Sequence, residues 1–521
     1  MNHWIILPLL LPALVAPLIA LAVRHDIVLA RVFSVASTVL LLLLGAILMG
    51  MAADGEIRFY ALGNWPPPFG IVLVLDRLAA LMLVLTAVLG LAVLLYAING
   101  WDRRGQHFHP IFQFQLMGIN GAFLTGDLFN LFVFFEVLLI ASYGLMVHGG
   151  GAQRLRAGVQ YVIVNLVGSG LFLIAVGLIY SVTGTLNMAD LAVRVAAVAP
   201  GDAALLHTGA LLLLLVFAIK AALVPVQFWL PGTYANAPAP VAALFAIMTK
   251  VGAYSIVRVY TLIFGAGAGE AAALAAPWLM PAALVTLALG MLGVLAARSL
   301  GQMVSFAVVG SMGTLLTAVA LFTPQAMSAA LYYLLHSTLV AGALFLIVDL
   351  VAERRPGHAD ALTVAPPFAQ GGLIAGAFFV GAIAMAGMPP LSGFIGKLLI
   401  LDGARDGPWA VWIWTLILAT SLFAIVGFAR GGSTLFWKSA AVGGHFRAAR
   451  RPPPALPFVA VGALLGATLA LTIFAGAVTR YLDQTSAQLF APAHYVDAVL
   501  GTEAPAGFDP LAGRMSDGGT D

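Results

Sequence analysis

The sequence predicts an all-α membrane protein that crosses the bilayer about fourteen times. Of its 521 residues, 62% are hydrophobic and 9% are charged, whereas a soluble domain contains about 25% charged residues. Apolar runs long enough to span a bilayer as a helix, about 20 residues each, recur from one end of the chain to the other. These runs lack the alternation of polar and apolar residues that a transmembrane β-barrel requires.

The first predicted span begins close to residue 1. No basic region precedes its apolar run and Arg24 follows the run, so we interpret the stretch as a retained span and not as a signal peptide. The fourth and fifth spans are short and separated only near Gly126-Asp127. The fourteen predicted spans cover residues 4–23, 30–53, 71–99, 109–126, 128–148, 159–183, 205–228, 239–262, 277–297, 301–322, 327–350, 372–402, 409–430 and 456–479.

Basic residues gather in alternate connections between these spans, and such an excess marks the cytoplasmic side. The basic connections contain Arg24, Arg31, Arg103, Arg104, Arg154, Arg156, Arg298, Arg354, Arg355, Lys438, Arg447, Arg450 and Arg451. The opposite connections contain few basic residues, namely Arg58, Arg194 and Arg405. We therefore expect both termini on the side of the membrane opposite the cytoplasm, as an even number of spans requires. After residue 483 the sequence predicts a short surface helix in "FAPAHYVDAVLG" and then a loose polar tail.

Several kinds of site are excluded by composition. The chain contains no cysteine, which excludes disulfides, thiolate-ligated iron–sulfur clusters and thiolate zinc sites. No glycine-rich phosphate loop stands between a strand and a helix. We expect no cofactor, no metal site and no nucleic-acid partner, and the composition makes the lipid bilayer the expected surroundings.

Five ionisable residues lie deep inside the predicted spans: Glu136, Lys220, Lys250, His336 and Lys397. Three of the chain's four lysines are among them. A charged side chain at mid-helix costs about 2.5–3.5 kcal/mol, so such residues usually face the bundle interior, form pairs and mark ion pathways. Lysine suits a proton pathway because, unlike arginine, it can give up its proton inside a protein.

Two of the predicted spans are broken by proline, which removes a backbone donor and crowds the preceding turn. Broken helices at membrane depth are typical of binding sites in transporters. Lys220 and Lys250 flank the first break and Lys397 follows the second, although the lysines do not fall in register. The prolines are Pro225, Pro231, Pro238, Pro240, Pro389 and Pro390.

A structural interpretation of each residue stays open. Glu136 and a lysine could form an ion pair that only locks two helices. His336 could be a hydrogen-bonded core residue, and Lys397 could extend to the membrane surface. Asp76 and Arg77, at the start of the third span, are expected to be a structural pair or to mark the boundary of the span. Taken together, one acid and four bases at mid-depth beside broken helices favour a chain of proton sites.

The same residues carry a resemblance to a known family. The stretch "KAALVPVQFWLPGTYANAPAPVAALFAIMTKVGAYSIVR" resembles the antiporter-like module of respiratory complex I, membrane-bound hydrogenases and Mrp-type cation/proton antiporters. Glu136 matches the glutamate of that module's fifth span, and Lys220 and Lys250 match the lysines of its seventh and eighth. His336 and Lys397 match the ionisable residues of its eleventh and twelfth. Within the superfamily, "FWLPGTYANA" is similar to the D-type component of Mrp antiporters. Complex I counterparts differ here, because they typically carry an acidic, histidine-bearing "HTWLPDAH"-like loop.

The resemblance implies a fold of fourteen helices with two inverted five-helix repeats, whose seventh and twelfth helices are broken. It divides the chain into three N-terminal helices (1–100), a first repeat (101–265), a second repeat (266–432), and a last span with a polar tail (433–521). It also implies a transporter subunit and not an enzyme, which works with other Mrp-type subunits to exchange protons for Na⁺ or K⁺.

The implied mechanism is a proton relay along the membrane centre. Lys220 is expected to alternate between Glu136 and proton release toward Lys250, with His336 passing the charge to Lys397. Two other hypotheses stay open at this point: a proton-pumping subunit of complex I or a membrane-bound hydrogenase, and a passive scaffold.

Overall fold

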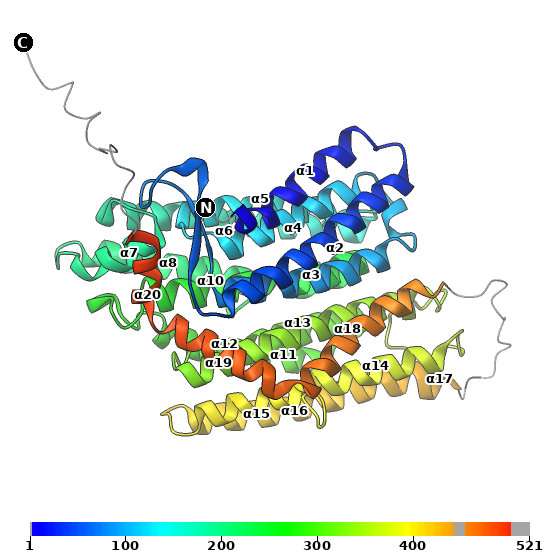
Figure 1. The fold of residues 1–521 in the computed structure, drawn as a ribbon. Helices are drawn as coiled ribbons and strands as arrows, with labels where there is room; N and C mark the ends of the chain where they lie inside the picture. Colours follow the sequence, from blue (N-terminus) through cyan, green and yellow to red (C-terminus); the bar gives the residue numbers. More distant parts are fainter. Residues whose placement is uncertain (1–2, 441, 443–453, 502–521) are drawn as a thin grey trace, which may run out of the picture.

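The chain folds into a bundle of long helices that run side by side, with a small β-hairpin at one end (Figure 1). The computed structural model describes residues 3–440, 442 and 454–501. Its two strands are β1 (Arg58–Ala61) and β2 (Val72–Leu75). Its α-helices are α1 (Leu7–Leu21), α2 (Ile27–Ala52), α3 (Arg77–Ala97), α4 (Phe108–Leu124), α5 (Leu128–Met146), α6 (Ala152–Thr183), α7 (Met188–Arg194), α8 (Ala203–Ala221), α9 (Trp229–Asn236), α10 (Ala239–Leu262), α11 (Ala276–Ala296), α12 (Leu300–Val319), α13 (Pro324–Ala352), α14 (Gly371–Ala386), α15 (Ser392–Ala404), α16 (Ala410–Gly432), α17 (Lys438–Ala440), α18 (Leu456–Ile473), α19 (Ala475–Leu489) and α20 (Pro492–Leu500).

Each of the fourteen predicted ranges contains a helix or two helices in succession. The described part of the chain has 11 helices long and apolar enough to cross a membrane, and two shorter apolar helices, α1 and α14. The protein is therefore a polytopic, all-α membrane protein, as the sequence predicts, and the count of fourteen spans stays a prediction. Both predicted breaks are present: α8 ends at Ala221 and α9 begins at Trp229, just beyond the seventh range, and the twelfth range is divided into α14 and α15.

The prediction was wrong where the third span begins. Residues 71–75 are as apolar as the residues of α3 that follow them, but Val72–Leu75 form strand β2, which pairs antiparallel with β1. Asp76 ends the strand and starts the helix, because its side chain accepts a hydrogen bond from the Ala79 amide at 2.8 Å. Such a cap satisfies an amide that the first turn of a helix leaves free.

The C-terminal region also departs from the prediction. The last span ends at Ile473, and α19 continues in a new direction across the end of the bundle toward α20 (Figure 1). The predicted short surface helix is present as α20, which lies on the surface of the bundle with Tyr495 and Val499 turned inward. The predicted polar tail, and the predicted cytoplasmic arginines Arg447, Arg450 and Arg451, lie outside the described residues.

Backbone pairing reveals the internal repeat. In each half, a short connection leads into a helix whose first residue is preceded by a capping side chain, Asp127 before α5 and Ser299 before α12. Each connection forms two backbone hydrogen bonds of 2.8–2.9 Å with the segment that follows the next long helix. They run from Leu128 to Leu186, Met188 to Gly126, Leu300 to Asp360 and Leu362 to Arg298. The two pairings lie at opposite ends of the bundle, at α7 and at the connection after α13, as expected for inverted repeats (Figure 1).

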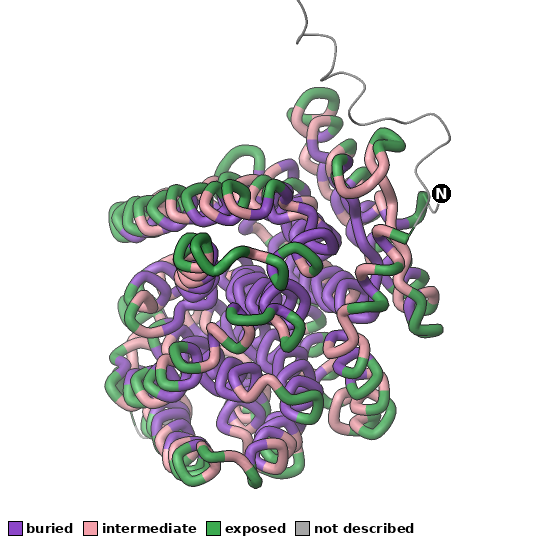
Figure 2. Tube along the Cα trace, turned by 90° about the vertical axis from the view of Figure 1, so that its left-hand side faces the viewer, coloured by how far each residue is buried: buried purple, intermediate pink, exposed green. Residues whose placement is uncertain are grey.

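Four helices form the centre of the bundle. The most apolar stretch of α10 is fully buried, and the corresponding stretches of α13, α12 and α3 are 94%, 89% and 78% buried. Seen from the α7 end, buried residues gather in the inner helices, and the outer helices turn exposed residues outward (Figure 2). The two innermost helices, α10 and α13, carry Lys250 and His336.

Candidate functional site

The five ionisable residues predicted from the sequence all lie in helices of the bundle. Lys220, Lys250, His336 and Lys397 are buried, and Glu136 is half-buried. They come from α5, α8, α10, α13 and α15, so that each residue depends on a different element for its position. The side chains around these residues indicate whether they form structural pairs between helices or a chain of proton sites.

Lys220 lies in the last turn of α8, immediately before the break, and its amine donates to Asn165 Oδ1 at 2.8 Å. Its Nζ also lies 5.8 Å from the centre of the Phe135 ring. Glu136 is engaged separately, because the Ser169 hydroxyl donates to its Oε1. Asn165 and Ser169 belong to α6 and are one helical turn apart, so one face of α6 holds both partners.

The predicted ion pair between Glu136 and Lys220 is not formed among the described residues, within 4.0 Å. The Glu136 carboxylate acts on Lys220 electrostatically without touching it. Asn165 and Ser169 were not predicted as site residues. The only sequence signal for them is two small polar residues four apart in the apolar text "NLVGS". The structure adds that they hold the acid and the base beside one another.

A small cavity lies beside Lys220, between α5, α6, α8 and α10. It has a volume of about 10 Å³ and is lined by Asn165, Tyr161, Trp229 and apolar side chains. A volume of about 10–15 Å³ is what one water molecule needs. Because polar groups border it, the cavity is suited to a single bridging water between the lysine and its surroundings.

Lys250 is fully enclosed by the bundle. It is 0% exposed, and its amine is among the buried side-chain atoms without a hydrogen-bond partner. Its helix lies directly against the end of α8, because a Cβ on Gly252 would stand 2.6 Å from the Ala221 amide nitrogen. A lysine that joins two helices needs a partner on the second helix, and the buried amine of Lys250 has no hydrogen-bond partner among the described residues. The position therefore favours a proton carrier over a structural role.

His336 lies on α13 and faces the second break. Its Nδ1 is 2.9 Å from the hydroxyl of Ser392, the first residue of α15. Both Lys250 and Lys397 act on the imidazole electrostatically. His336 is therefore within electrostatic reach of both lysines, and its part in a relay stays a prediction.

Lys397 is buried and points into the bundle, which contradicts the alternative that it extends to the membrane surface. Its amine donates to the carbonyl of Ala386 at 2.7 Å and to the Ser421 hydroxyl at 2.8 Å. Ala386 is the last residue of α14, so the amine lies at the carbonyl end of that half-helix. The negative end of the helix dipole stabilises a cation there.

The ionic residues at the start of α3 are structural, although the predicted pair is not the one formed. Asp76 pairs with Arg258 of α10, with 2.6 Å between Oδ2 and Nη1, and both side chains are buried. Arg77 donates instead to the Ala53 carbonyl. In the described part of the chain, no three His, Asp or Glu side chains lie close enough together to hold a metal ion.

Comparisons with known proteins fit this geometry. Residues 125–424 match the family described as NADH:quinone oxidoreductase/Mrp antiporter, transmembrane region. The chain is 42% identical to the D component of a probable K⁺/H⁺ antiporter of Rhizobium meliloti, over 96% of this chain and 98% of that protein. It is 39% identical to the D component of the Na⁺/H⁺ antiporter of Bacillus subtilis, over 96% and 100%. A chain in the solved structure of the Mrp complex from Dietzia sp. DQ12-45-1b has a TM-score of 0.86 and 29% identity, over 96% of this chain and all of that one.

Proposed function

The chain belongs to the NADH:quinone oxidoreductase/Mrp antiporter transmembrane family, and we propose that it is the proton-translocating D-type component of a multisubunit monovalent-cation/proton antiporter. The observation that carries this proposal is the row of buried ionisable groups from Glu136 through Lys250 to Lys397, each on a different helix. Near-full-length similarity to the D components of known antiporters supports the same assignment. The protein is then a transporter component and not an enzyme.

The proposed mechanism is a relay in which one proton shift triggers the next. Lys220 alternates between two settings. In one it donates to Asn165, and in the other it approaches Glu136, a residue of α5 that is bonded by Ser169, one turn along α6 from Asn165. When the ammonium of Lys220 releases its proton toward Lys250, the carboxylate is left with less positive charge beside it. Charges inside a protein interact strongly over several ångströms, so the change propagates without a large movement of the backbone.

The second half of the relay runs through His336 to Lys397. The imidazole is held by Ser392 at the break, so a proton arriving from Lys250 meets a ring of fixed orientation. Lys397 is the last carrier, steadied by Ala386 and Ser421. We assign the repeats to residues 101–265 and 266–432, preceded by three helices at 1–100 and followed by the segment 433–521.

The half-exposed position of Glu136 supports a contact with a partner subunit at this residue. A carboxylate at the edge of a membrane helix is costly against lipid, and its only described hydrogen bond comes from Ser169. A neighbouring subunit would cover it, and the other large and small subunits of an Mrp-type complex are the proposed partners. We place the protein in the bacterial inner membrane, with both termini on the periplasmic side according to the distribution of arginine.

The experiment that tests this function uses inside-out vesicles from an antiporter-deficient bacterium that expresses the whole operon. The vesicles are energised, and the collapse of the pH gradient is followed after addition of Na⁺ and, separately, of K⁺. Collapse with either ion supports the antiporter and identifies its cation. A redox-driven pump, the alternative within the family, would show no collapse with either ion and would co-purify with iron–sulfur subunits.

A further inference from the structure

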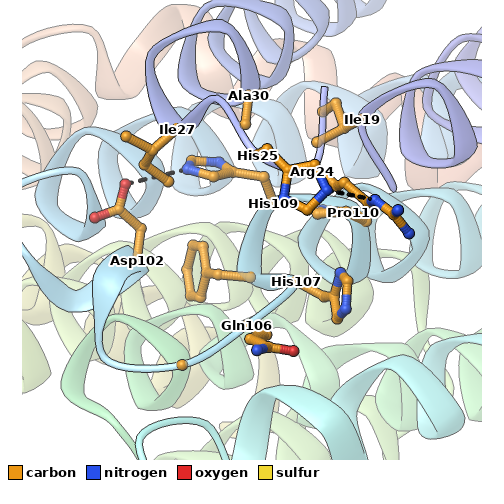
Figure 3. Close-up of a pocket in the computed structure, with 12 residues that line it drawn as sticks. Ile19, Arg24, His25, Ile27, Ala30, Asp102, Gln106, His107, His109 and Pro110 are labelled. Carbon is orange, nitrogen blue, oxygen red and sulfur yellow. Dashed lines mark hydrogen bonds and ion pairs between the residues drawn. The ribbon is translucent and has the colours of Figure 1, made fainter. Parts of the chain in front are cut away.

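A polar pocket opens at the end of the bundle where α1 turns into α2 and where α4 begins. Its volume is about 360 Å³, and none of the five ionisable residues of the row lines it. Figure 3 shows the side chains that do. Its basic side is formed by Arg24, His25, His107 and His109. We call it the basic pocket, and none of these four residues has a part in the proposed relay.

The one acidic residue that lines the pocket is already neutralised. Asp102 accepts two hydrogen bonds from Arg31, at 2.6 and 2.8 Å, and lies 3.2 Å from His109 Nε2. The nearby carboxylate of Asp26 is turned to the start of α2, where it accepts from the amides of Val28 and Leu29. The described residues that line the pocket therefore present no unpaired carboxylate that would repel an anion.

The buried histidine of the pocket is His109. Its side chain is 2% exposed, its Nε2 faces Asp102, and its Nδ1 has no hydrogen-bond partner. Arg24 is exposed and engages only the neighbouring His25 ring, at 2.9 Å, so its guanidinium remains available. The partnerless nitrogen of His109 calls for a polar ligand, and the available guanidinium of Arg24 favours a ligand that carries negative charge.

The opposite side of the pocket is apolar and continues onto the membrane-facing surface. Ile19, Ile27 and Ala30 line it. Beside them Leu21 and Val28 are 78% and 60% exposed. Helices α1 and α2 lie at the outer edge of the bundle (Figure 1), so this apolar surface faces lipid or a neighbouring subunit. Free phosphate would use only the basic side, whereas an amphiphile would use both.

We propose that the basic pocket binds the phosphate head group of an anionic phospholipid, whose acyl chains lie along α1 and α2. The phosphate contacts Arg24, His25 and His107 at the mouth and reaches His109 inside. Basic pockets between membrane helices recognise anionic head groups in this way. The assignment does not depend on the proposed transport function, because it uses no residue of the relay.

The test uses the purified complex, reconstituted in phosphatidylcholine vesicles that also contain phosphatidylglycerol, and then extracted. Native mass spectrometry measures the phosphatidylglycerol that stays bound. Variants are Arg24→Gln, His107→Gln and the double variant, and Arg405→Gln is the matched control at an exposed site at the opposite end of the bundle. Arg24 and His107 lie at the surface end of the pocket and not in the core, so neither single variant threatens folding.

We expect wild type and Arg405→Gln to retain phosphatidylglycerol equally. Arg24→Gln should lower its affinity about five-fold, the equivalent of ~1 kcal/mol for one basic group at an anionic surface, and the double variant should lower it further. Excess inorganic phosphate should not displace the lipid. The proposal is overturned if the double variant retains as much phosphatidylglycerol as wild type, or if inorganic phosphate displaces all of the lipid. It is also overturned if the double variant keeps its lipid but loses a neighbouring subunit, because protein would then fill the pocket.

Discussion

The two halves of the bundle build the same helix break and place a lysine at it from opposite directions. In both, the residue after the first half-helix has a left-handed backbone, Ala222 with φ 53° and Gly387 with φ 78°. In both, the following amide reaches back five residues, from Leu223 to Ala218 at 2.9 Å and from Met388 to Ile383 at 3.0 Å. This is the capping pattern that satisfies the last carbonyls of a helix.

The direction of approach explains why the lysines do not match in the sequence. Lys220 precedes its break and Lys397 follows its own, yet both lie at the carbonyl end of the first half-helix, α8 or α14. That end carries the negative part of the helix dipole. The two halves therefore share the location of the amine, at the carbonyl end of a half-helix, although the lysine that supplies it stands at a different place in the sequence of each half.

The halves differ in what accompanies the lysine. In the first half Glu136 lies nearby and Asn165 accepts from Lys220, whereas in the second half the Ala386 carbonyl and the Ser421 hydroxyl receive Lys397. A carboxylate can gain or lose charge and a carbonyl cannot. We therefore infer that the first half contains the switch and that the second half contains a carrier that responds to it.

The largest effect is expected when the first half is made to resemble the second. Glu136→Gln removes the charge, while size and the hydrogen bond from Ser169 are kept. Cation/proton exchange should fall by at least about ten-fold, which corresponds to ~1.4 kcal/mol at the limiting barrier. The collapse of the pH gradient in inside-out vesicles measures it, with Glu353→Gln as the control, because Glu353 pairs with Arg104 at an exposed site. Wild-type exchange by Glu136→Gln would mean that the two halves work alike.

A smaller effect is expected from the cap of the second break. A Cβ at position 387 would lie 2.7 Å from Lys397 Cδ, and the backbone there is left-handed, which costs an L-residue roughly 1–2 kcal/mol. Gly387→Ala should displace the lysine and lower exchange about five-fold, since ~1 kcal/mol at the barrier has that effect.

The counterpart variant, Ala222→Gly, should leave exchange unchanged, because glycine adopts the conformation of Ala222 without strain. Rates of both variants are compared at equal amounts of assembled complex. Full activity of Gly387→Ala would remove the argument that the cap positions Lys397.

The smallest effect is expected at Ser421, one of the two acceptors for Lys397. Ser421→Ala leaves the Ala386 carbonyl in place, so exchange should fall only about two-fold, in line with roughly 0.5 kcal/mol, the lower end of the range for one hydrogen bond. Thr434→Ala is the control, because its hydroxyl bonds the carbonyl four residues earlier, as that of Ser421 does, at an exposed position. A loss as large as that of Glu136→Gln would make the serine a member of the relay.

The parts of this comparison that depend on residue type could be predicted from the sequence. Prolines located both breaks, and ionisable residues in apolar text located the five ionisable groups inside the bundle. Asn165, Ser169, Ser392 and Ser421 were missed, because small polar residues are common in membrane helices and their partners come from other elements. The β-strand at 72–75 was missed because its apolar text runs into α3, and Asp76, a typical capping residue, was the available signal for the boundary.

The most direct test of the relay compares two lysines of the same chain. Lys220→Ala removes the buried amine at the first break, and Lys438→Ala removes an exposed one. The collapse of the pH gradient on adding Na⁺ or K⁺ is measured for both, with assembly followed on native gels. If Lys220 is the switching carrier, Lys220→Ala assembles fully and exchanges nothing, while Lys438→Ala behaves as wild type. Normal exchange by Lys220→Ala, or a loss only in proportion to lost assembly, would contradict the relay.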